Sequence, residues 1–99
     1  MTKTITIPEN VRNDIQALQY EVESRKNLLT FMMQNGTDID SDNFVKYHTK
    51  YQEFFNKYEH AKQAMQDTYL QPQVEGKLIN WNLDFATCEV TCEYDRVQA

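Results

Sequence analysis

Two long stretches of helical apolar spacing, separated by a short polar segment, most constrain what this chain can fold into. Over residues 9–35 the apolar positions recur at alternating steps of four and three, which predicts a helix with one apolar stripe. The stripe consists of Val11, Ile15, Leu18, Val22, Leu29 and Met32. Arg25 stands where one more apolar residue is due. Asn35-Gly36 is typical of a helix end, because glycine adopts the left-handed conformation that closes a helix.

The second stretch predicts a helix over residues 41–70, since the residue before Pro72 avoids the helical conformation. Its stripe consists of Phe44, Tyr47, Tyr51, Phe54, Tyr58, Ala61 and Met65, with Phe55 and Tyr69 at its sides. Asp40 is the expected N-cap, and Ile39 and Phe44 are placed to form a hydrophobic staple around it. Two helices joined by so short a loop predict an antiparallel helical hairpin.

The two ends of the chain have the period-two alternation of β-strands. Residues 2–7 alternate threonine with isoleucine and predict a short strand. Residues 78–85 and 88–94 predict a β-hairpin, in which a turn centred on residues 86–87, or a loop over 85–88, places Leu83 opposite Val90. The apolar residues expected on its packed face are Ile79, Trp81, Leu83, Phe85, Cys88, Val90, Cys92 and Tyr94.

The expected fold class is therefore α+β, a long antiparallel hairpin of two helices with a small antiparallel sheet. The C-terminal β-hairpin forms this sheet, and we expect the N-terminal strand to add to it. A chain of 99 residues has room for one core, so we expect a single domain over residues 1–99. Because an isolated β-hairpin is only marginally stable in water, its apolar face must lie against the helices or against another molecule.

Charge and hydropathy narrow the classes of function. The formal net charge is −5, whereas a nucleic-acid ligand needs a basic face that neutralises phosphates, so we expect no nucleic-acid partner. No run of about 18 apolar residues predicts a membrane span, and residues 1–10 lack the apolar core of a secretion signal. The sequence thus predicts a cytoplasmic protein.

Two segments that begin like metal or redox sites have the wrong spacing for them. Residues 38–42 start like a calcium loop, but Asn43 and Thr49 stand where that loop needs Gly and Glu, so a helix cap and turn are favoured. Cys88 and Cys92 lie about 13 Å apart on a strand, beyond the reach of a disulfide, and no histidine stands near them to complete a zinc site. We expect them to be free, packed thiols.

The histidines, glycines and serines of the chain do not have the spacing of a catalytic site. His48 and His60 are separated by more than three turns of the predicted helix and do not share a metal ion. The two glycines are isolated, and no serine stands in a nucleophile elbow. We therefore expect no catalytic residues, no metal ion, no cofactor and no enzymatic activity.

An excess of aromatic residues and a row of acids indicate a surface that binds other proteins, because Tyr, Phe and Trp are enriched in interface cores. The candidate interface residues are Tyr47, Tyr51, Phe54, Phe55, Tyr58, Tyr69, Trp81, Glu89 and Glu93. A filled intramolecular core is the alternative for the aromatics, and it is the favoured one for Trp81. Solubility and edge protection are the alternative for the acids. The sheet edges are further places where a partner strand could add.

A helical hairpin followed by a β-hairpin tail, in a chain rich in Asn, Gln and Tyr, resembles small proteins of phages and prophages of Gram-positive bacteria. Some of those proteins build or decorate virions, so the resemblance implies a structural or accessory subunit of an assembly such as a virion, with other protein subunits as partners. Two alternatives stay open. One is an acidic adaptor or inhibitor that docks on a single partner protein, and the other is a homo-oligomer that self-associates through the second helix.

Overall fold

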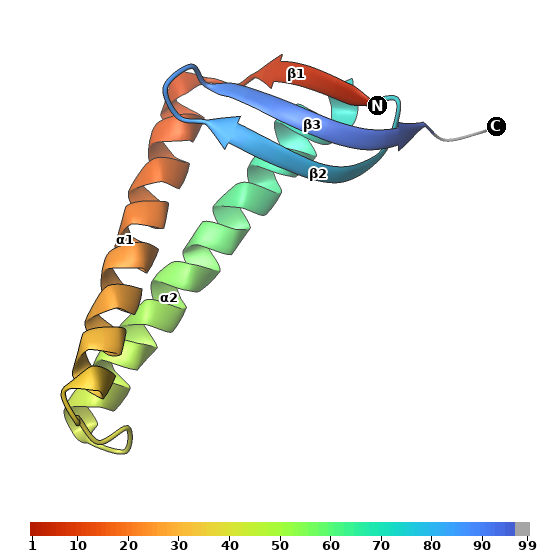
Figure 1. Cartoon of the computed structure of the whole chain (residues 1–99). Coiled ribbons are helices and arrows are strands. Elements are labelled where there is room, and N and C mark those ends of the chain that lie inside the picture. Colours follow the sequence, from red (N-terminus) through yellow and green to blue (C-terminus); the bar gives the residue numbers. More distant parts are fainter. Residues whose placement is uncertain (97–99) are drawn as a thin grey trace.

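The computed structural model describes residues 1–96 and contains two long helices with a three-stranded antiparallel sheet at one end of them (Figure 1). The fold class expected from the sequence is confirmed. The elements in chain order are β1 (Thr2–Thr6), α1 (Glu9–Gln34), α2 (Asp42–Met65), a π-helical turn (Gln66–Leu70), a 3₁₀ turn (Gln71–Gln73), β2 (Gly76–Asp84) and β3 (Glu89–Arg96).

Both helix starts and the first helix end follow from local chemistry. Pro8 has extended dihedral angles and precedes α1, while Gly36, with a φ of 78°, follows its end. The expectation that Asp40 caps α2 is wrong, because the side chain of Ser41 accepts the hydrogen bond from the Phe44 N–H at 3.2 Å. The Asp40 N–H donates instead to the carboxylate of Asp38, in a turn that precedes the cap.

The second helix does not stay α-helical to its end. Regular α-helix stops at Met65, and the π-helical turn and the 3₁₀ turn follow. In a regular helix the ring of Pro72 would clash with the carbonyl group of Thr68, four residues earlier. We attribute the wider turn over 66–70 to this clash.

The strand order is β1-β3-β2, so the N-terminal strand joins the C-terminal hairpin as expected. Leu83 lies opposite Val90 and Trp81 opposite Cys92, which confirms the predicted register. The four-residue loop, and not the two-residue turn, joins the strands, and Cys88 in it has a φ of 61°. A side chain at positive φ costs about 1 kcal/mol, which the hydrogen bonds of this loop offset.

Ile79 of the hairpin does not lie on the packed face that the alternation predicted for it. The register of β2 shifts between Leu78 and Asn80, so Leu78 pairs with Tyr94 and Ile79 is the extra residue of a β-bulge. Ile79 was expected on the packed face, but its side chain is 55% exposed. Leu78 takes its place against the core.

The core lies between the inner face of the sheet and one end of the helix pair. Val90 and Cys92 in the central strand β3 are fully buried, as is Leu70 in the π turn. The other buried members are Ile5, Ile7, Ile15, Met65, Val74, Leu83 and Tyr94. Arg12 ties α1 to the hairpin loop by donating to the Phe85 carbonyl oxygen at 2.6 Å. This end of the molecule is called the head below.

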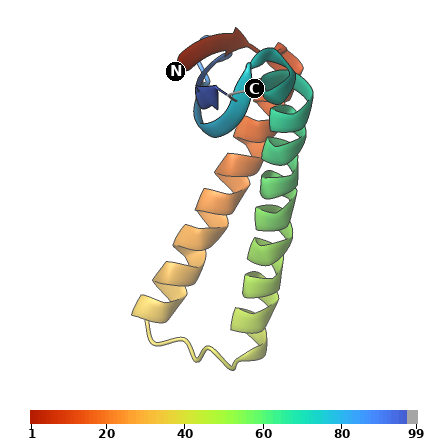
Figure 2. The same cartoon turned by 90° about the vertical axis from the view of Figure 1, so that its right-hand side faces the viewer.

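The strands run across the helices, so the sheet covers only the head end of the helical hairpin (Figures 1 and 2). We call the uncovered remainder, residues 20–57, the arm. Only Val22, Leu29 and Phe44 are buried in it. The arm makes the molecule 55 Å long, with a radius of gyration of 17.4 Å, compared with about 13 Å for a compact chain of this length.

Within residues 1–96, neither helix has the length and apolarity needed to cross a membrane.

Replacing Gly76 by Ala should destabilise the sheet. A Cβ at this position would run into the backbone carbonyl group of Asp95 on the paired strand. We expect Gly76→Ala to lower the free energy of unfolding by about 1–3 kcal/mol in denaturant titrations. The matched control is Lys77→Ala, at the exposed next position, which should stay within about 0.5 kcal/mol of wild type. Equal effects of the two substitutions would contradict the close approach of β2 to β3.

Burial of Cys92 should make stability fall at alkaline pH. Burial raises the pKa of the Cys92 thiol, so the folded state holds this proton more tightly than the unfolded chain. Its contribution is complete below the unfolded pKa of about 8.5 and is lost as the pH rises through the folded pKa. Denaturant titrations across this range should therefore show a steeper alkaline loss for wild type than for Cys92→Ala. Identical slopes would overturn this assignment.

Candidate functional site

Helix α2 has two rows of largely apolar side chains that share members. The first row includes Tyr47, Phe54 and Ala61, of which Phe54 meets Arg25 of α1. The second row, one residue farther along the chain, includes His48 and Phe55 and becomes charged at Lys62. Both rows share the residues at seven-residue intervals from Phe44, namely Phe44, Tyr51, Tyr58 and Met65. The helix thus has an apolar surface wider than the single stripe that packs on one neighbour.

Four side chains of the second row stack along the arm. The ring centroids of Phe44 and His48 are 6.2 Å apart, those of His48 and Tyr51 are 6.3 Å apart, and those of Tyr51 and Phe55 are 6.0 Å apart. We call these four residues the aromatic ladder. Phe55 remains 37% exposed and His48 is exposed, whereas Tyr51 is half-buried. The ladder is therefore an ordered aromatic row that other parts of the chain cover incompletely.

The aromatic ladder continues a row that the sheet covers at the head. Met65 of this row is fully within the core, and Tyr58 packs against the core. Tyr58 also lines a small hollow together with Trp81 and with Gln19 of α1. The sheet therefore lies on the ladder side of the helix pair, and its cover ends where the ladder begins.

The two sides of the arm differ in charge. Gln19 marks the ladder side of α1, and the residues at seven-residue steps from it are Lys26 and Met33. Asp14 and Ala64 line a hollow on the other side, and seven residues farther into the arm from each are Glu21 and Lys57. The ladder side of the arm thus carries few charges, Lys26 beside the ladder and Glu23 next to Gln19, whereas the charged residues of the opposite side are engaged with each other and with Phe54.

Ion pairs and cation–π contacts occupy that opposite side. Arg25 stands at the gap in the apolar stripe of α1, where its guanidinium lies 4.5 Å from the ring centroid of Phe54 and its Nε lies 3.3 Å from the carboxylate of Glu21. Lys57 lies 5.1 Å from the same ring centroid. These contacts keep Phe54 between charged groups, so it belongs to the contact between the helices.

The remaining aromatic candidates lie in the head. Trp81 is half-buried, and its indole N–H donates to the side-chain oxygen of Gln66 at 3.3 Å, which places it against the helices. Tyr69 belongs to the π turn and is packed against the core. Tyr47, outside the head, is 40% exposed on the arm. The structure thus brings Tyr51 and Phe55 together in the ladder and separates them from Trp81 and Tyr69.

Glu89 and Glu93 lie far from the aromatic ladder, on the outer face of the sheet. Glu89 is paired directly with Asp84 of β2, and Glu93 is paired with Asn80. Both are exposed, as is Asp95 on the same face of β3. Like charges that face each other across a strand pair repel each other. The Asp84–Glu89 pair therefore lowers the stability of the β2–β3 pairing slightly.

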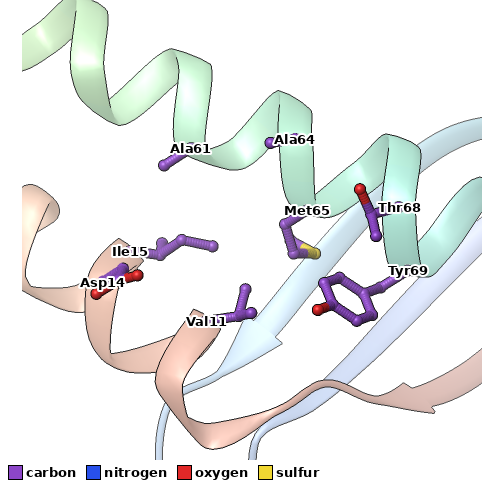
Figure 3. A pocket seen from close by; sticks show the side chains of 8 residues that line it. All are labelled: Val11, Asp14, Ile15, Ala61, Ala64, Met65, Thr68 and Tyr69. Carbon is purple, nitrogen blue, oxygen red and sulfur yellow. The ribbon is translucent and has the colours of Figure 1, made fainter.

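A hollow of about 250 Å³ lies between α1 and the π turn (Figure 3). Its lining is mostly apolar, and Figure 3 shows the ring of Tyr69 extending from the π turn toward Val11. Asp14 supplies its single carboxylate, and Thr68 a hydroxyl group. This hollow lacks the converging acid and base that proton transfer requires.

Several exposed residues were not singled out by the sequence analysis as interface candidates. Tyr20 on α1 is 72% exposed, and other exposed apolar residues lie toward the loop end of the arm, including Phe31, Met33, Ile39 and Val45. His48, which the sequence analysis considered only as a metal ligand, is exposed and also stacks between Phe44 and Tyr51 in the ladder. Its position four residues after Phe44 and three before Tyr51 is the signal that would have identified it.

Among residues 1–96, no three His, Cys, Asp or Glu side chains come close enough to hold a metal ion, and Cys88 and Cys92 are free thiols. No protein-family model, no curated protein and no solved structure matches this chain.

Replacing Arg25 by Leu should stabilise the contact between the helices. Leu would complete the apolar stripe of α1, and exchanging a half-buried ion pair for apolar packing is neutral or stabilising when the volumes match. We expect the free energy of unfolding to rise by about 1 kcal/mol in denaturant titrations. Lys46→Leu, on the exposed side of α2, is the control and should change it by less than about 0.5 kcal/mol. A clear loss of stability in Arg25→Leu would show that the cation over Phe54 stabilises the arm.

Proposed function

We propose that this chain is a non-enzymatic protein–protein interaction module that serves as a structural or accessory subunit of a larger assembly, such as a phage virion. The observation that carries the proposal is the aromatic ladder, which extends a buried row of α2 beyond the cover of the sheet. An apolar row that is covered at the head and open along the arm is typical of a subunit that another protein completes.

The chemistry of the ladder side supports a protein partner. Interface cores are rich in aromatic residues and methionine and poor in charge, and this side combines the uncharged ladder with Met33, while Lys26 and Glu23 lie at its α1 flank. The opposite side of the arm, with Glu21, Arg25 and Lys57, suits solvent. A phosphate-bearing ligand would need a surface rich in Lys and Arg, which the ladder side is not.

The lining of the hollows supports a role without catalysis. The hollow beside the π turn has one carboxylate, the hollow shared by Trp81 and Tyr58 has none, and the hollow on the other side of Trp81 has Glu93 without a basic partner. The resemblance of the whole chain to small phage and prophage proteins gives the kind of assembly proposed. The partners are then other protein subunits, and the location is the virion or the cytoplasm in which it is built.

The test is whether the protein travels with assembled particles. Particles released from the source cells are separated on a density gradient, and the chain is quantified by mass spectrometry in each fraction. We expect it to follow the particles at a constant ratio, and Phe55→Glu to remove it from them. The matched control is Tyr20→Glu, which changes a more exposed aromatic residue outside the ladder and should leave the ratio unchanged. A chain found only in the free fraction would refute the proposal.

The acidic outer face of the sheet favours a second candidate, an adaptor or inhibitor that docks on one basic partner. Asp84, Glu89, Glu93 and Asp95 lie on this face, with Lys77 opposite Asp95. Binding through it would weaken steeply with salt, and Glu89→Gln with Glu93→Gln would abolish it. Binding through the aromatic ladder would be insensitive to both changes, which separates the two candidates.

A further inference from the structure

We propose that the occupant of the aromatic ladder is a second copy of this chain, whose own ladder packs antiparallel against it so that the two arms form a four-helix bundle. This inference rests on the proposed function, because it names a partner for the same surface. It also gives the subunit a defined symmetry, a two-fold axis that crosses the ladder.

The repeat of α2 is that of a helix with two neighbours. Its first row, through Phe54 and Ala61, lies toward α1, and its second row, through His48 and Phe55, repeats with the same seven-residue period. Helices with two such rows lie in bundles, where each contacts helices on two sides. At the head the sheet takes the place of the second neighbour. Along the arm this place is open, and a helix from another copy has the matching period.

The exposed area fits a dimer. The chain has an accessible surface of 6935 Å², whereas a compact protein of 11.8 kDa exposes about 5,900 Å². The excess of about 1,000 Å² is comparable to the roughly 800 Å² that each partner buries in a stable interface of standard size. Contact with one further copy would therefore bury, per chain, most of the area that this chain exposes in excess of a compact monomer.

The charge distribution suits a second copy of the same surface. Two identical faces repel each other when they carry net charge, but the four ladder residues include no carboxylate or ammonium group, and the α1 flank has Lys26 and Glu23, which are of opposite sign. A partner attracted by charge would need a charged face, which this side lacks. In the antiparallel arrangement Phe44 lies opposite Phe55 of the second copy, and His48 lies opposite Tyr51 of the second copy. Because Phe44 is already buried within its own chain, the new contacts are those of His48, Tyr51 and Phe55 with the same row of the second copy.

The position of the sheet selects the antiparallel arrangement. The sheet lies on the ladder side at the head and covers the same row through Tyr58 and Met65. Two parallel arms would bring both sheets to the same end, where they would collide before the ladders met. Antiparallel arms place the sheets at opposite ends, so each head lies beyond the loop end of the other arm and the ladders meet between them.

The test measures the mass of the purified full chain by size-exclusion chromatography with light scattering over a wide concentration series. Wild type should reach twice the chain mass of 11.8 kDa and dissociate on dilution. Phe55→Glu and His48→Glu, which place two carboxylates in the interface, should each raise the dimer Kd by about 100-fold or more. Tyr20→Glu is the matched control outside the ladder and should dimerise like wild type. Far-UV circular dichroism verifies that each variant is folded, and His48 is exposed enough to carry the test if Phe55→Glu does not fold.

Three results would overturn the inference. The first is a wild-type monomer at every concentration, and the second is a dimer that survives both ladder substitutions or is lost in Tyr20→Glu. The third is a small-angle scattering profile with a maximum dimension near twice the 55 Å length of the monomer, which would indicate end-to-end contact. None of these results bears on whether the chain travels with particles, so the inference can fail while the proposed function stands.

Discussion

The rest of this structure depends on covering one apolar face of a small sheet. β3 is paired on both sides, and its Val90 and Cys92 can leave water only if helices lie against them. The strands run across the helices (Figure 1), so the sheet covers a length set by its width, about 15 Å for three strands. The longer helix, α1, extends about 39 Å. This mismatch leaves more than half of the helical hairpin as an arm without cover.

The arm has no sheet to cover it, and long polar side chains cover part of its apolar surface instead. Val22, Leu29 and Phe44 are its only buried residues within the described chain, which is little for two helices of this length. Arg25 and Phe54 fill the middle of the contact with a cation over a ring, and this arrangement keeps apolar area from water while it leaves charge at the surface. The arm is thus anchored to the core of the head, but its side chains along the ladder are only partly covered.

The sequence predicted what depends on near neighbours along the chain. Alternation with period two placed Leu83 opposite Val90, because a slip of one residue would turn every apolar side chain to water. It missed the bulge at Ile79, since a bulge depends on how β2 follows β3 in space. It named Tyr51 and Phe55, and the spacing of His48 from Phe44 and Tyr51 also predicts that these rings are neighbours. Where the sheet stops along the helices depends on contacts between distant segments, so the exposure of this row was not predictable.

Phe54 and Phe55 show that two neighbouring residues of the same type can have different surroundings in the folded chain. They are adjacent and chemically identical, yet the helix turns them about 100° apart, so one meets Arg25 across the hairpin and the other meets Tyr51 along the ladder. A sequence that only stabilised a two-helix hairpin would have a polar residue at the second position. Phe55 stacks on Tyr51 but keeps 37% of its side chain exposed, so its burial within the monomer is incomplete. This incomplete cover is the reason why we propose a contact outside the single chain.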